Sequence, residues 1–360
     1  THEPQAELQS ILHKYDLNPD FPQSVLGEAK GIPPTVQTSQ LAGREDLRGL
    51  YTFTIDPDVA KDFDDALSLE QSNSQLRIGI HIADVANYVT PESALDKEAR
   101  NRGNSTYLVG TVIPMLPHAL SNGVCSLVEN EDRLTKSVFL NFSLGGKFKG
   151  AEFANTVIRS DKRLTYKQAY TLLFNEHVAA ARKLKLPPSH QTGSTGRVLA
   201  DLPEEEIQML QTNLKKLWKI AFKLRSDRMR TGSLDLDMSE TKIFVDENGY
   251  ADRLEKVEND ESHQLIEEFM LAANEAVAKA MRRASLPCIY RAHDDPDEDR
   301  LSELRDFLAT FGVTVADLSI RAEMIKLTQQ LNTHPQSHIL KSQLLRSLKK
   351  ACYRSTPDGH

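Results

Sequence analysis

The chain has 360 residues, of which 39% are hydrophobic and 26% charged, a composition typical of a soluble globular protein. No apolar run approaches the ~20 residues needed to cross a bilayer, so we expect no contact with a membrane. The first residues, THEPQAELQS, lack the basic start and apolar core of a signal peptide. The net charge of −7 argues against nucleic-acid binding by bulk charge alone.

The three cysteines are far apart in the sequence, and none belongs to a C-x-x-C motif. Cys125, Cys288 and Cys352 therefore favour neither disulfides nor a zinc site. This usage predicts a protein of the reducing cytoplasm.

The first half of the chain alternates apolar and polar residues in the manner of strands. Residues 1–50 indicate a short helix at Ala6–Tyr15 followed by a connection rich in Pro and Gly, which we interpret as a lead-in from an upstream region. Strands are then predicted at 51–55, 66–69, 76–82, 138–142 and 152–158, with Gln71–Gln75 as the turn of a hairpin.

The second half has mainly helical spacing. Residues 186–203, rich in Pro, Gly, Ser and Thr, predict a surface loop, and the turn DENG predicts a hairpin of 242–245 with 253–257. Helices are expected at 166–176, 204–230, 261–283, 297–312, 318–332 and 337–353. Strands first and helices later favour a mixed α/β (α+β) fold, with a mainly antiparallel sheet in the N-terminal half and helices in the C-terminal half.

The segment TIDPDVAKDFDDALSL carries the clearest chemical signal. Five carboxylates, those of Asp56, Asp58, Asp62, Asp64 and Asp65, follow an apolar strand within ten residues. Such crowding of like charges costs folding energy unless a cation is bound, and oxygen ligands suit Mg²⁺ or Mn²⁺. Two such ions ~4 Å apart activate a water and stabilise the leaving oxygen in phosphoryl chemistry.

Three other interpretations of this segment need comparison. A calcium loop of EF-hand type that begins at Asp62 has Leu67 and Asn73 where Gly and Glu are required. Asp56 and Asp58 resemble the paired aspartates of haloacid-dehalogenase phosphatases, but that reaction gives the other three aspartates no task. A solvated acidic turn does not account for Phe63 in its middle.

The aspartate segment D-P-x-x-x-x-D-x-D-D-A resembles the signature of the ribonuclease II and ribonuclease R family, in its RNB catalytic domain. The segments that continue the resemblance follow in family order: HIADVANYV (81–89), LDKEARNRGNSTYL (95–108), IPMLPHALSNGVCSL (113–127), RLTY (163–166) and HQLIEEFMLAANEAVA (263–278). We take 51–360 as this catalytic domain, with the wider resemblance starting near residue 20.

The resemblance implies a processive 3′–5′ exoribonuclease that hydrolyses single-stranded RNA to nucleoside 5′-monophosphates with Mg²⁺, for which Mn²⁺ is the alternative ion, and that acts as a monomer. It assigns Asp56, Asp62 and Asp65 to metal, and Asp64 to the aspartate that the chemistry requires. The chemistry of the residues alone leaves all four as candidate metal ligands. The alternative is a non-catalytic RNA-binding or regulatory relative that kept the fold.

Three further residues receive RNA-binding roles from the resemblance. Tyr107 matches an aromatic residue that stacks on the terminal nucleotides, which tolerates any base. Leu236 stands where the family often has the phenylalanine of the opposite wall, and leucine cannot stack as an aromatic ring does. Glu268 matches a glutamate near the active site, although the apolar periodicity of 261–283 alone predicts a solvated side chain. His81, Asp84 and Asn274 also lie in family-like segments, where structural roles are at least as plausible.

The end of the chain, STPDGH, precedes the point where the family has a segment of the type T-S-P-I-R-R-Y, whose arginine contacts the scissile phosphate. We therefore expect a catalytic domain that is incomplete at its C-terminus, without the OB domains that flank it in the family. Loss of that positioned cation predicts slow hydrolysis.

Overall fold

A computed structural model describes residues 4–175, 178–185, 196–234, 236, 240–356 and 358. The chain forms two compact units. The first comprises Thr1–Lys219 and Thr241–Ala273, and the second Ile220–Glu240 and Asn274–His360. Neither contains a described helix long and apolar enough to cross a membrane.

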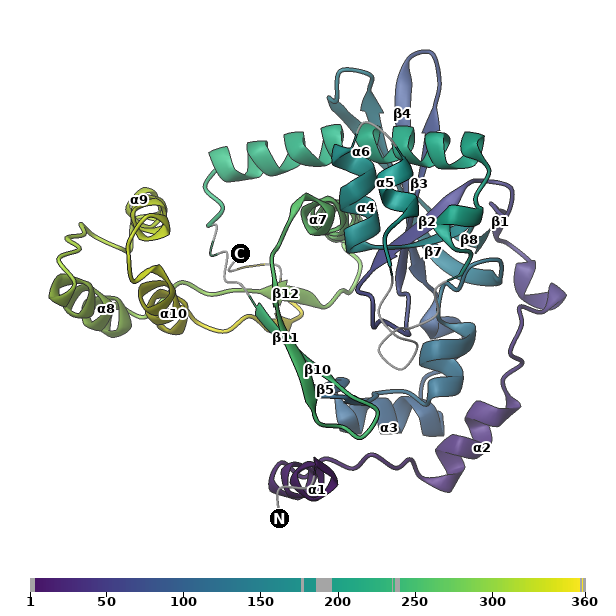
Figure 1. Ribbon diagram of the computed structural model, residues 1–360, viewed down its shortest axis with the longest axis horizontal. Helices are drawn as coiled ribbons and strands as arrows, with labels where there is room; N and C mark the ends of the chain where they lie inside the picture. Colours follow the sequence, from purple (N-terminus) through teal and green to yellow (C-terminus); the bar gives the residue numbers. More distant parts are fainter. Residues whose placement is uncertain are drawn as a thin grey trace. The chain divides into compact units, whose positions relative to one another are not determined.

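A seven-stranded sheet organises the first unit (Figure 1). Its order is β1-β8-β7-β4-β3-β2-β9, in which the neighbours from β8 to β2 are antiparallel and the two edge strands are parallel to their neighbours. The strands are β1 (Glu45–Asp46), β2 (Thr52–Asp56), β3 (Asp65–Gln71), β4 (Gln75–Ala83), β7 (Asp132–Ser143), β8 (Phe148–Arg159) and β9 (Lys162–Thr165). The predicted mixed fold with a mainly antiparallel sheet is confirmed.

The sheet lies where the apolar alternation predicts strands. In the hairpin β3–β4, Leu67 pairs with Ile80 and Leu69 with Ile78, and the buried members of these pairs belong to the core. The strands β7 and β8 extend beyond their predicted bounds, and the short edge strands β1 and β9 were not predicted. Both edges pair in parallel with segments more than 100 residues away, so no local pattern marks them.

Two helices lie in the predicted lead-in. The helix α1 (Pro4–Lys14) confirms the first prediction, but α2 (Gln23–Gly31) lies where we predicted only a connection. Val25 and Ala29 of α2 are buried in a hydrophobic cluster with Leu95 of α3 (Ala94–Arg102), and this packing outweighs the two glycines of α2. The role of residues 1–50 as a lead-in stays a prediction.

The remaining elements of the first unit are short helices and hairpins. They are the 3₁₀ segments η1 (Thr38–Leu41), η2 (Val85–Asn87) and η5 (Leu199–Asp201), the π-type turn η3 (Leu120–Val124), the helices α4 (Tyr166–Phe174) and α5 (Ala179–Arg182), and the hairpins β5 (Thr106–Leu108)–β6 (Thr111–Ile113) and β10 (Glu240–Val245)–β11 (Ala251–Val257). The long helices α6 (Glu204–Arg230) and α7 (Glu261–Arg283) begin in this unit and end in the second. The predicted loop 186–203 contains η5, and its residues 186–195 lie outside the described part.

The second unit buries its own apolar cluster between α8 (Glu298–Thr310), α9 (Arg321–Asn332) and α10 (Ser337–Ser347). These helices confirm the predicted helical C-terminal half, but the helix predicted at 337–353 is too long. It ends at Ser347, and β13 (Cys352–Arg354) pairs with β12 (Tyr290–Ala292). Such pairing between segments 60 residues apart leaves no periodic signal in the sequence.

Candidate active site

The acidic loop, residues 57–64, joins β2 to β3, so that Asp56 ends one strand and Asp65 begins the next. Phe63 is fully buried, its backbone N–H donates to Ser126 Oγ over 3.0 Å, and its carbonyl accepts from Leu127 N over 2.8 Å. The Asp64 carbonyl accepts a bond of 3.0 Å from Ala83 N. The apolar residue inside the acidic run therefore anchors the loop to the core, which distinguishes it from a solvated turn.

The carboxylates of this loop stand in an environment that disfavours their charge. Burial, with the nearby charges of Asp65 and Asp64, raises the pKa of Asp56 to about 7. Burial and the charge of Asp64 raise the pKa of Asp65 to about 6. Loss of solvent and the charge of Asp62 raise the pKa of Asp64 as well. The charged forms of Asp56, Asp64 and Asp65 therefore cost free energy until a cation offsets their charge.

The donor chemistry of this cluster fits a hard divalent cation. Asp56 is 8% exposed, and its Oδ2 is buried without a hydrogen-bond partner among the described residues. A buried carboxylate oxygen with no donor is costly unless a cation binds it. No three His, Cys, Asp or Glu side chains of the described residues already converge on one ion position. Binding therefore requires the aspartate side chains to turn toward a common centre.

Two basic side chains flank the loop. Arg163 on β9 is 1% exposed, and its Nη2 donates to the carbonyl of Pro57 over 2.6 Å. The exposed Lys167 of α4 lies 3.7 Å from the carboxylate of Asp58. Asp58 thus has an ion-pair partner of its own, which accords with its absence from the four candidate ligands.

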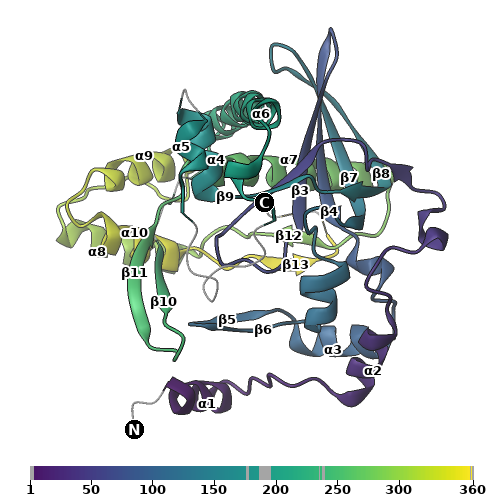
Figure 2. The same cartoon turned by 45° about the vertical axis from the view of Figure 1, so that its right-hand side comes forward.

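Tyr107 lies on β5 and is 67% exposed, as a stacking residue must be. Partial burial and the charges of Asp62 and Asp64 raise the pKa of the Tyr107 hydroxyl, so this hydroxyl lies near the acidic loop. The turn of its hairpin contacts β10, since a Cβ on Gly110 (φ +74°) would lie 2.9 Å from Val245 Cγ2 (Figure 2). Tyr107 and the aspartates are therefore brought together in one unit.

Glu268 lies on the part of α7 that belongs to the first unit and is 2% exposed. Its burial shows that the apolar periodicity predicts its environment wrongly. Near the start of α7, His263 stacks on Tyr166 with ring centroids 3.7 Å apart. Burial and the charges of Asp56, Asp65 and Asp260 raise the pKa of Tyr166, so this end of α7 lies beside the aspartates.

Leu236 belongs to the second unit, where it packs half-buried against the cluster of α8, α9 and α10. Part of its predicted motif, residues 235 and 237–239, lies outside the described residues. The RNA-binding role of Leu236 stays a prediction.

His81 and Asp84 have structural partners. His81 is fully buried between Ser68 and Ser137, which it contacts at 2.9 and 2.7 Å, and burial lowers its pKa to about 3. Asp84 forms a buried ion pair of 2.6 Å with Arg44. Both residues stabilise the fold beside the loop.

Residues 44–360 match the RNB domain, so the chain belongs to the RNB family of proteins. It is 38% identical to ribonuclease R of Thermotoga maritima over 99% of this chain and 48% of that protein. The chain spans about half the length of the curated relatives it matches, for example 41% and 49% of two further ribonuclease R proteins.

Two solved structures have a fold similar to that of this chain. Ribonuclease R of Mycoplasma genitalium in complex with ribose-methylated single-stranded RNA is 26% identical, with a TM-score of 0.83 over 100% of this chain and 53% of that chain. The same enzyme in complex with double-stranded RNA has a TM-score of 0.85 at 26% identity, over 100% of this chain and 60% of that chain.

From the sequence we did not identify Arg163 and Lys167, the two basic side chains that contact the loop. Arg163 lies in the segment RLTY, which we noted for its resemblance but gave no task. A basic residue inside an otherwise buried strand is the available signal, because such a charge persists only with partners.

Proposed function

We propose that this chain supplies the catalytic site of a 3′–5′ exoribonuclease that hydrolyses single-stranded RNA to nucleoside 5′-monophosphates. The observation that carries the proposal is the cluster of Asp56, Asp62, Asp64 and Asp65 at the acidic loop and the adjoining ends of β2 and β3, in a member of the RNB family. Asp56 in this cluster has a buried carboxylate oxygen without a donor among the described residues. The similarity to ribonuclease R supports the same conclusion.

In this proposal Asp56, Asp62, Asp64 and Asp65 hold Mg²⁺, with Mn²⁺ as a substitute. Bound divalent ions supply charge neutralisation of the phosphate and an activated water. The protein contributes the fixed loop, whose backbone bonds at Phe63 and Asp64 keep the carboxylates together. With the backbone fixed in this way, ion binding needs rotation of the aspartate side chains but no rearrangement of the loop.

RNA is proposed to enter with its 3′ end first. The exposed ring of Tyr107 stacks on a terminal base, and because every base has a π face the enzyme is indifferent to sequence. Leu236 is proposed as the apolar opposite wall and Glu268 as a residue of the active-site surroundings. We also propose residues 51–360 as the catalytic domain, a monomeric protein and a cytoplasmic location, the last supported by the free state of its three cysteines.

The test is a time course on 5′-labelled single-stranded RNA with Mg²⁺ or with EDTA. We expect labelled fragments that shorten to a small end product, with unlabelled nucleoside 5′-monophosphates released in step, and only with Mg²⁺. A circular RNA of the same sequence serves as the control, because an exonuclease requires a free end. RNA binding without turnover would identify a non-catalytic relative, and hydrolysis of small phosphate esters alone would favour the phosphatase.

Metal binding should stabilise the chain in a pH-dependent manner. The folded-state pKa values of Asp56 and Asp65, about 7 and about 6, exceed the ordinary value of 3.8. The folded state therefore binds more protons than the unfolded state, and the metal-free protein loses stability as pH rises from about 4 to about 7. Above pH 7 the carboxylates are ionised and free to bind a cation.

We accordingly expect saturating Mg²⁺ to raise Tm at pH 8 by about 5 °C or more, since a ligand at 100 times its Kd adds about 2.7 kcal/mol. At pH 5 protons compete, and the rise should be far smaller. Differential scanning fluorimetry measures both, with NaCl of equal ionic strength as the control. An equal rise at the two pH values, or with NaCl, would contradict a site built from these carboxylates.

A further inference from the structure

Arg163 is a fully buried cation directly behind the acidic loop. It lies on β9 opposite Thr54 of β2, and Thr165, two residues further along β9, pairs with Asp56. Its Nη2 donates to the carbonyl of Pro57 at 2.6 Å and approaches that of Asp58 at 3.5 Å. The guanidinium carbon lies 5.4 Å from the centre of the Phe63 ring. One side chain therefore contacts both the first residues of the loop and its apolar anchor.

Burial of such a charge needs compensation, because an isolated charge in the protein interior is strongly disfavoured. The compensating charges include Asp56 and Asp58, which act on the guanidinium electrostatically. The Nε of Arg163 has no hydrogen-bond partner among the described residues, so hydrogen bonding alone does not account for its burial. The acidic loop is what makes a cation favourable at this position.

We propose that Arg163 is a positioning residue, which holds the backbone that follows Asp56 so that the aspartates of the loop can gather around divalent cations. This inference rests on the proposed function. Arg163 reaches the loop through main-chain carbonyls, and it acts on the metal site through the conformation of residues 57–64.

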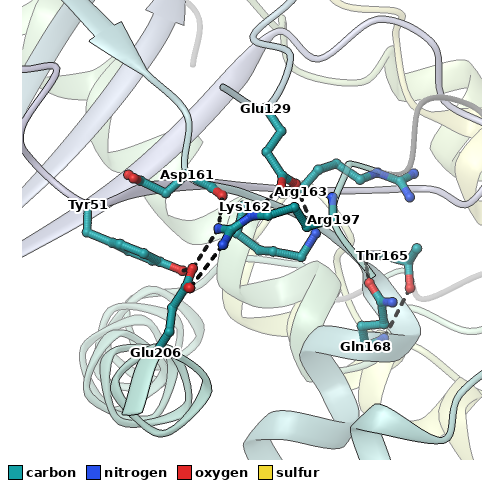
Figure 3. A network of polar contacts seen from close by, with 9 residues as sticks. All are labelled: Tyr51, Glu129, Asp161, Lys162, Arg163, Thr165, Gln168, Arg197 and Glu206. Atoms are coloured by element: carbon teal, nitrogen blue, oxygen red, sulfur yellow. Dashed lines mark hydrogen bonds and ion pairs between the residues drawn. The ribbon is translucent and has the colours of Figure 1, made fainter. Parts of the chain in front are cut away.

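An ionic network centred on the buried Glu129 also holds β9 (Figure 3). The carboxylate of Glu129 accepts from the backbone N–H of Arg163 at 3.0 Å and from Lys162 Nζ at 2.9 Å. Arg197 donates to the second oxygen of Glu129 and also to Glu206. Although burial alone would raise it, these donors hold the pKa of Glu129 below its usual value. The strand that carries Arg163 is thereby held by charged hydrogen bonds to its main chain and to Lys162.

The geometry favours arginine over lysine. The planar guanidinium offers several donors in a fixed arrangement, so that one group can bond a carbonyl and still pack against an aromatic ring. A lysine ammonium keeps the charge but loses this shape. Arg163→Lys therefore removes the positioning while it retains the positive charge behind the loop.

The chain offers a matched control in Arg102. Its side chain is 9% exposed, it donates to the carbonyls of Pro114 and Asp20 at 3.2 and 2.6 Å, and it lies 3.7 Å from the centre of the Phe21 ring. Arg102 thus resembles Arg163 in burial, backbone bonds and aromatic contact, but it belongs to α3 and does not contact the loop. Arg102→Lys measures the cost of losing such contacts elsewhere.

The experiment titrates the full chain with Mn²⁺, with free ion measured by electron paramagnetic resonance, and determines the Mg²⁺ concentration for half-maximal RNA hydrolysis. We expect Arg163→Lys to raise both half-saturation concentrations about tenfold, with hydrolysis largely restored at high Mg²⁺. RNA affinity in EDTA should change less than twofold. Arg102→Lys should lower Tm without moving either half-saturation value.

An unchanged Mn²⁺ half-saturation in folded Arg163→Lys would overturn the proposal, whatever its Tm. Glu129→Gln provides a second route if Arg163→Lys does not fold: it weakens the support of β9 and should raise the Mn²⁺ half-saturation about threefold, and an unchanged value would again overturn the proposal. If the parent binds Mn²⁺ but does not cleave RNA, the proposed function fails while the Mn²⁺ titration still decides the role of Arg163.

Discussion

Asp64→Asn is expected to lower RNA hydrolysis by about 10²- to 10³-fold, the effect typical of removing one positioned group that stabilises charge in an active site. The backbone carbonyl of Asp64 accepts a hydrogen bond from Ala83 N, which holds the main chain at this residue independently of the side chain. Asparagine keeps the shape of the side chain and the loop, so only the charge is lost. The measurement is the single-turnover rate of mononucleotide release at saturating Mg²⁺.

RNA binding by this variant should persist. One fewer negative charge beside the phosphates leaves the Kd in EDTA equal or slightly lower, as fluorescence anisotropy can show. The matched control is Asp58→Asn, also an aspartate of the loop, which is paired with Lys167 and has no assigned ligand role. We expect less than a threefold loss of rate for it. The opposite order of the two variants would favour the phosphatase chemistry that depends on Asp56 and Asp58.

The aspartates could be predicted from sequence because they are adjacent in the chain. An apolar strand, an aspartate-rich segment and a second apolar strand indicate the loop without any long-range contact, and the burial of Phe63 agrees with it. The buried environment of Glu268 could not be predicted, because side chains at the edge of an amphipathic face are buried or exposed according to what packs there. Here the resemblance to a family pointed to a residue that periodicity alone had set aside.

The ionic network of Glu129, Lys162 and Arg197 could not be predicted from the sequence for a different reason. Glu129 reaches Lys162 across 33 residues and Arg197 across 68, so no spacing rule connects them. The pair β12–β13 and the edge strands β1 and β9 were missed likewise, because these short strands pair with segments distant in the chain. Local patterns thus predicted the loop that we propose to carry the chemistry, whereas the buried charges of Arg163, Lys162 and Glu129 could be found only from the fold.

Gly79→Ala is expected to destabilise the first unit strongly. Gly79 lies on β4 opposite Ser68, where a Cβ would clash with Ser68 Oγ and lie 2.6 Å from His81 Nε2. Both neighbours are fully buried and hydrogen-bonded to each other at 2.9 Å, so neither can withdraw. Overpacking costs about 1–3 kcal/mol and each buried polar group left unpaired about 1–3 kcal/mol, which together give roughly 3 kcal/mol or more.

The matched control is Gly150→Ala on β8, where a Cβ would meet nothing within 4 Å. Its stability should change by less than about 1 kcal/mol. Urea unfolding followed by the fluorescence of Trp218, the single tryptophan, reports on the first unit, which contains it. Because Ser68 lies on the strand that begins at Asp65, Gly79→Ala should also weaken Mn²⁺ binding in whatever fraction remains folded. Equal urea midpoints for the two variants would contradict this prediction. They would mean that Ser68 and His81 can move to accommodate a Cβ at Gly79 at little cost in stability.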